Sequence, residues 1–277
     1  MSADDLSAEE LFLDEIFEDD AAPEPCTSGP HTEYAHLKLD STTETMFGRL
    51  QVRHPQAFSE LAREAAEVVD TVVPIAEAHL GSALTGTLRL DLLPQARVSG
   101  VNPTIGLLRH AMIAFDEPSP KLAGLLSYQV GQVLWYRATR EADYSGYRRM
   151  PDWLREAALL PLMHAWSDRE RWLEALAGQI SVVARGQLLT STQMVDFSAL
   201  SPKQGLVASA QSLLRGQSVG RRTPKWEAGL CALLGERPRL GGVEGLEHLT
   251  SLSLTDWEAH FAADLDDWVA TLTDRHH

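Results

Sequence analysis

The chain has 277 residues, of which 44 % are hydrophobic and 23 % charged, and its formal net charge at pH 7 is −15. This length and composition allow a buried core in one large domain or in two smaller ones. The negative charge argues against a nucleic-acid partner, which requires a basic surface, and the two cysteines, Cys26 and Cys231, are too few for a disulfide framework or a zinc ribbon.

The two usual signals for export and membrane insertion are missing from the sequence. The N-terminus lacks the basic region and apolar core of a signal peptide. No stretch of about 18 apolar residues is available to span a bilayer. We therefore expect a cytoplasmic protein that makes no membrane contact.

Residues 1–30 are predicted to form an acidic tail. Residues 1–25 contain ten Asp or Glu and no Lys or Arg, so residues 26–277 carry a net charge of only −5. A segment with so many like charges and few apolar groups cannot offset the entropy lost on folding. We therefore expect most of the tail to be disordered.

One short helical motif interrupts this tail. In "SAEELFLDEIFED", Ser7 is a candidate N-cap and Glu10 follows three residues later, as in a capping box. Leu13, Ile16 and Phe17 then lie on one apolar stripe. Because a helix this short is marginal alone, we hypothesise that the stripe binds a protein partner. The alternative is a solubilising tail without a partner.

Residues 31–120 are predicted to form a small β-rich subdomain. A long helix should begin at Gln56, be kinked at Pro74 and end at Gly81. Alternation of apolar and polar residues predicts four strands, at 33–40, 47–55, 86–94 and 110–117.

Residues 121–277 read as a helical subdomain. The apolar residues there recur at helical spacing. Helices are predicted at 121–140, 151–166, 168–186, 202–216, 224–234, 242–249 and 255–272. A β-rich half followed by a helical half indicates an α+β fold.

The first of these helices has a polar notch in an apolar stretch. "LLSYQVGQVLWYR", residues 125–137, carries Tyr128, Gln129 and Gln132 together. Residues 128 and 132 share one helix face because they are four apart. Zinc peptidases place their metal-binding histidine pair at this spacing.

The element order, the notched helix and "MPDWLREAAL" together resemble the peptidase-MA-like gluzincins, relatives of the thermolysin-type zinc peptidases. That family carries His-Glu-x-x-His on one helix and its third zinc ligand, a glutamate, on the next. The resemblance implies a zincin-like fold, with Glu156 at the third-ligand position. Tyr128 stands at the first histidine, Gln129 at the glutamate and Gln132 at the second histidine. Ala157 replaces the glycine that follows the family's third ligand.

These replacements remove the chemistry of a zinc peptidase. An amide or a neutral phenol is a poor zinc ligand, and Gln129 cannot act as a general base. We therefore expect no metal, no cofactor and no catalytic residue, and interpret the chain as a catalytically inactive, metallopeptidase-like binding or regulatory module. The alternatives are an enzyme with non-zinc chemistry in the same cleft, a structural adaptor with a filled cleft, or an unrelated helical protein with ordinary polar residues.

A basic stretch follows later in the chain. "RGQSVGRRTPK" contains Arg215, Arg221, Arg222 and Lys225. A solvated loop is the simpler interpretation, and the alternative is an anion dock for an acidic peptide, including the tail of this chain.

Overall fold

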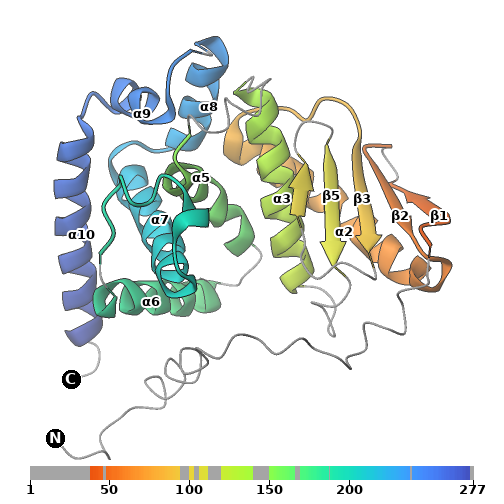
Figure 1. Cartoon of the computed structure of the whole chain (residues 1–277), viewed down its shortest axis with the longest axis horizontal. Helices are drawn as coiled ribbons and strands as arrows, with labels where there is room; N and C mark the ends of the chain where they lie inside the picture. Colours follow the sequence, from red (N-terminus) through yellow and green to blue (C-terminus); the bar gives the residue numbers. More distant parts are fainter. Residues whose placement is uncertain are drawn as a thin grey trace, which may run out of the picture. The chain divides into compact units, whose positions relative to one another are not determined.

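The computed structural model of the chain (Figure 1) describes residues 38–45, 48–93, 100–102, 106–111, 120–139, 150–165, 169–186, 188–237 and 239–274. All of these belong to one compact unit, residues 37–277. The predicted partner-binding stripe of Leu13, Ile16 and Phe17 lies outside the described residues.

A five-stranded sheet stands on the N-terminal side of this unit. Its strands are β1 (Ser41–Glu44), β2 (Leu50–His54), β3 (Leu88–Leu93), β4 (Gly100–Asn102) and β5 (Leu107–Ala111). Their order across the sheet is β1-β2-β3-β5-β4. The three central strands run parallel, and β1 and β4 pair antiparallel at the two edges.

The central strands were easier to predict than the edges. β2 and β3 lie within the predicted strands at 47–55 and 86–94. The first predicted strand, at 33–40, lies mostly outside the described residues; its last three residues are irregular, and β1 follows them. The last predicted strand, at 110–117, is described only at 110 and 111, which belong to β5, and β5 begins earlier, at Leu107. Short edge strands such as β1, with the sequence STTE, and β4 bury too little to show an apolar alternation.

Helix α2 (Ser59–Leu80) connects the parallel strands β2 and β3 and covers one face of the sheet (Figure 1). Most of its Ala and Val side chains face the core, with Val69 and Val72 fully buried. The helix ends as predicted at Gly81, whose φ of 62° suits glycine. It continues through Pro74, so the kink there stays a prediction.

Seven further helices follow in the described part of the chain, and the protein is a mixed α and β structure. They are α3 (Pro120–Ala138), α5 (Asp152–His164), α6 (Arg169–Arg185), α7 (Pro202–Arg222), α8 (Trp226–Glu236), α9 (Gly242–Thr250) and α10 (Leu254–Asp274). Every helix predicted from residue 121 onward is present, but α7 runs six residues past its predicted end at 216. None of the described helices is both long and apolar enough to cross a membrane.

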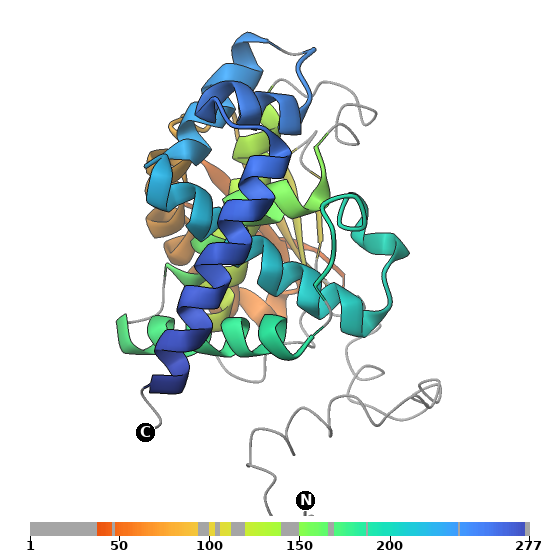
Figure 2. The same ribbon diagram turned by 90° about the vertical axis from the view of Figure 1, so that its left-hand side faces the viewer.

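Two buried clusters hold these elements together. The larger joins the sheet to α2, α3, α5 and α8, and Trp135 and Trp226 are among its largest members. The smaller lies between α6, α7 and α10 and includes Leu214, Phe261 and Trp268. Figure 2 shows α10 lying lengthwise across this second group. The predicted division into subdomains at residues 120 and 121 stays a prediction.

Candidate functional site

Helices α3 and α5 approach each other closely because glycines line their contact. A Cβ on Gly124 would lie 2.7 Å from the backbone oxygen of Met163, and a Cβ on Gly131 would lie 2.5 Å from Leu162 Cδ1. Since α3 also packs against α2 and the sheet, most of its other faces are buried. The half-buried side chains of Tyr128 and Gln132 remain on the face toward α5.

Tyr128, Gln132 and Glu156 converge, as expected from their assignment to the three ligand positions. The Tyr128 hydroxyl donates a hydrogen bond of 2.5 Å to Glu156 Oε1. Gln132 Nε2 donates to the same hydroxyl oxygen at 3.3 Å. One phenol therefore connects the two helices at the place where the sequence predicted a degenerate metal site.

The side chain of Glu156 is buried, and the guanidinium that the structure describes beside it is shared with a second carboxylate. Its side chain is 11 % exposed, and Arg155 Nη2 lies 3.5 Å from Oε1. The same Arg155 nitrogen lies closer, at 2.7 Å, to Asp152 Oδ1. Burial raises the pKa of Glu156, and the opposing effects of Arg155 and the Tyr128 hydrogen bond do not cancel it.

Gln129 differs from the other two notch residues in its exposure. It is 2 % exposed, whereas Tyr128 and Gln132 are half-buried. A carboxylate at this position would be desolvated, so the amide is the better side chain for the folded protein as it stands.

A segment that the sequence did not single out holds the start of α5. The backbone N–H groups of Asp152 and Trp153 donate to the carbonyl oxygens of Val195 and Met194 at 3.0 and 3.2 Å. In return, the N–H of Phe197 donates to Asp152 Oδ2 at 2.8 Å. Asp152 thus orients Arg155 with one oxygen and binds residues 188–200 with the other.

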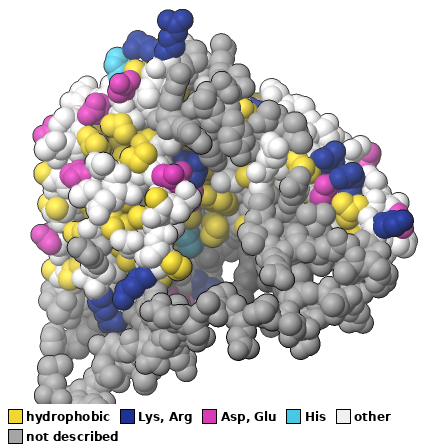
Figure 3. All heavy atoms as spheres, in the orientation of Figure 1, with side chains coloured by type: hydrophobic (Ala, Val, Ile, Leu, Met, Phe, Trp, Pro, Cys, Tyr) yellow, Lys and Arg dark blue, Asp and Glu magenta, His cyan; other side chains and the backbone are white. Residues whose placement is uncertain are grey.

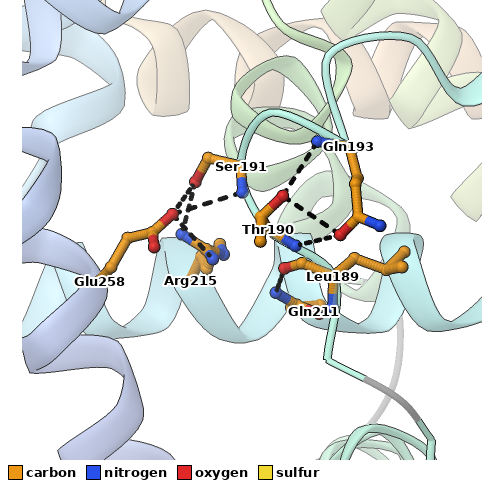
Figure 4. Close-up of polar contacts among 7 residues, drawn as sticks. All are labelled: Leu189, Thr190, Ser191, Gln193, Gln211, Arg215 and Glu258. Atoms are coloured by element: carbon orange, nitrogen blue, oxygen red, sulfur yellow. Dashed lines mark hydrogen bonds and ion pairs between the residues drawn. The ribbon is translucent and has the colours of Figure 1, made fainter.

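The other end of this segment is fixed to α7 and α10 (Figure 4). The amide of Gln211 accepts from Leu189 N at 3.1 Å and donates to Leu189 O at 2.6 Å. The Ser191 hydroxyl donates to Glu258 Oε1 at 2.5 Å and accepts from Arg215 Nη1 at 3.1 Å. Sequence reasoning missed this network because its members are 22 to 67 residues apart and form no local motif.

The interpretation of the stretch with Arg215, Arg221, Arg222 and Lys225 as a solvated loop needs correction. Residues 215–222 are the end of helix α7, not a solvated loop, and only Lys225 lies beyond it. The basic side chains in Figure 3 lie in separate small groups on the face shown.

The arginines of this stretch pair with carboxylates of helix α10. Arg215 is buried beside Glu258, at 3.6 Å, and over the ring of Phe261. Arg222 donates to both oxygens of Asp264, at 2.5 and 3.1 Å, and Arg221 Nη1 also contacts Asp264, at 3.3 Å. These arginines neutralise carboxylates of α10, and the anion dock stays a prediction.

The comparisons with known proteins leave the site to be interpreted from its geometry. No protein-family model matches the chain, and no curated protein is significantly similar to it. Within the described residues, no three His, Cys, Asp or Glu side chains gather as a metal-binding set.

Proposed function

We propose that the chain is a catalytically inactive, metallopeptidase-like protein whose notch serves as a binding site. The acidic tail, through Leu13, Ile16 and Phe17, engages a protein partner. The observation that carries the proposal is the hydrogen bond from Tyr128 to Glu156, 2.5 Å long. It occupies the carboxylate that the gluzincin resemblance assigns to a metal.

The polar groups of the notch support binding rather than hydrolysis. A zinc peptidase needs three ligands, an open coordination position and a base that takes a proton from water. Here the two positions four residues apart carry a phenol and an amide, and those groups bond to each other and to Glu156. The position between them carries the buried amide of Gln129, which cannot take a proton.

The neighbouring sheet edge favours a peptide as the ligand. β4 is the last strand in the sheet order, and among the described strands only β5 pairs with it. β4 also contacts α3, as Figure 1 shows. An extended peptide added to this edge by backbone hydrogen bonds would run beside the notched helix.

Restoring the metal ligands tests the proposal. We expect the variant Tyr128→His, Gln129→Glu, Gln132→His to bind about one zinc ion per chain in a calorimetric titration, because Glu156 already contacts position 128, and position 132 lies beside it. The matched control adds Glu156→Gln to these changes and should lose that binding. A restored variant that keeps the wild-type circular dichroism spectrum but binds no zinc would contradict a metallopeptidase-like scaffold.

A further inference from the structure

The direction of the hydrogen bonds in the notch determines which atoms remain for a ligand. Tyr128 has one hydroxyl hydrogen, and it is directed to Glu156 Oε1. The phenol oxygen must therefore accept from Gln132, which fixes the amide with Nε2 toward the phenol and Oε1 away from it. Glu156 Oε2 and Gln132 Oε1 have no hydrogen-bond partner among the residues that the structure describes.

The charged side chains that the structure describes at Glu156 sum to a negative charge. Arg155 is the positively charged side chain that the structure describes in contact with Glu156, and it also pairs with Asp152. With Glu156 ionised, one guanidinium therefore faces two carboxylates. The two oxygens without partners are also both acceptors, so the notch offers hydrogen-bond acceptors and a net negative charge to anything that enters.

We infer that the notch binds a primary ammonium group, which donates to Glu156 Oε2 and Gln132 Oε1. This inference rests on the proposed function and names the chemical group that the binding site takes. An ammonium has three N–H donors and a compact charge, so it can serve two acceptors from different helices and still donate to a third group. Its charge also offsets the cost of ionising a buried carboxylate.

The ammonium group can come from two parts of a peptide. One is the free N-terminal amine, and the other is the side chain of a lysine. β4 contacts the notched helix, and we propose that a peptide lying along β4 presents one or the other to the notch. The two sources differ only in how the amine is attached, so peptides that carry one source at a time can distinguish them.

Calorimetric titration of the full chain with three peptides tests the inference. The probes are tetra-alanine amide with a free N-terminus, N-acetylated tetra-alanine amide, and the acetylated peptide with one alanine replaced by lysine. We expect the uncharged acetylated peptide to bind at least about tenfold more weakly than the better of the two charged peptides, as for loss of a charge-assisted hydrogen bond. Whichever charged peptide binds more tightly identifies the source.

Two variants of the protein test whether Glu156 is responsible for the tighter binding of the charged peptide. Glu156→Gln keeps the shape of the side chain and should weaken the better charged peptide by about tenfold or more. Glu227→Gln is the matched control, since burial raises the pKa of that glutamate as well, but it lies on α8. The control should leave the affinity unchanged.

The outcomes separate this inference from the function on which it rests. If the acetylated peptide binds as tightly as the charged ones, and Glu156→Gln has no effect, the ammonium inference is overturned while peptide binding stands. If no peptide binds, the inference is also overturned. The zinc titration of the restored variant then decides separately whether the metallopeptidase-like scaffold survives.

Discussion

A carboxylate, a hydroxyl and at least one guanidinium meet both where α3 contacts α5, at the notch, and where α7 contacts α10, at the seam. The pKa of the carboxylate is raised at the notch and lowered at the seam. Glu156 in the notch accepts from Tyr128 and lies beside Arg155. Asp264 in the seam accepts from Ser218 at 2.5 Å and lies beside both Arg221 and Arg222. Both carboxylates are largely buried, with side chains 11 % and 7 % exposed.

The number of cations beside each carboxylate explains why the pKa values of the two carboxylates shift in opposite directions. Burial raises the pKa of Glu156, and one shared guanidinium does not offset it. Burial also acts on Asp264, but hydrogen bonds from Arg222 and Ser218 outweigh it and lower its pKa. A satisfied carboxylate such as Asp264 stabilises the fold. A carboxylate with too little positive charge around it, such as Glu156, is suited to receive a cation.

The largest expected effect comes from removing each charge by an isosteric change. Asp264→Asn should lower the free energy of unfolding by about 2 kcal/mol at neutral pH, because Arg221 and Arg222 lose their anionic partner. Glu156→Gln should lower the free energy of unfolding by less than about 0.5 kcal/mol, or should raise it, because a costly buried charge disappears. Urea unfolding of both variants checks this, and equal losses would refute the contrast.

A smaller effect is expected from separating the two helices of the notch. Gly124→Ala should lower the free energy of unfolding by about 1 kcal/mol or more, since its Cβ would lie 2.7 Å from the oxygen of Met163. The matched control is Gly178→Ala on α6, where no atom lies within 4 Å. That change should add about 0.5–1 kcal/mol by helix propensity. If Gly178→Ala lowered the free energy of unfolding as much as Gly124→Ala does, close packing would not be the cause.

The smallest effect on stability is expected from the tail, which belongs to neither region. Changing Leu13, Ile16 and Phe17 together to alanine should leave the thermal unfolding of the compact unit unchanged, because the stripe is proposed to serve a partner. In a partner pull-down, the same variant should lose most of the partner recovery that is lost when residues 1–30 are deleted. Recovery should also weaken at higher salt if the carboxylates steer association. A triple variant that recovers the partner as wild type does would leave the stripe without a role.

Local sequence patterns predicted the elements whose signals lie within a few residues. The helices from α3 to α10, the strands β2 and β3, and the C-terminal Gly81 of α2 follow from periodicity and capping. The convergence of Tyr128 with Glu156 was also predicted, though it rested on a family resemblance that the comparisons do not test.

Features made by long-range pairing could not be predicted in the same way. The pairing of Arg222 with Asp264 joins residues 42 apart, and that of Ser191 with Glu258 joins residues 67 apart. Neither pair leaves a local pattern, so the arginines were interpreted as a loop or an external dock. The edge strands β1 and β4 were missed because edge strands bury little apolar surface.

Site-resolved carbon NMR of the Glu156 and Asp264 carboxyl groups, titrated in one sample, measures the contrast between the two carboxylates. We expect a pKa for Glu156 above the ordinary glutamate value and a pKa for Asp264 below the ordinary aspartate value. Tyr128→Phe should raise the pKa of Glu156 further, because the hydroxyl favours the ionised form. A Glu156 pKa at or below the ordinary glutamate value would contradict the account, since the notch would then be as well satisfied as the seam.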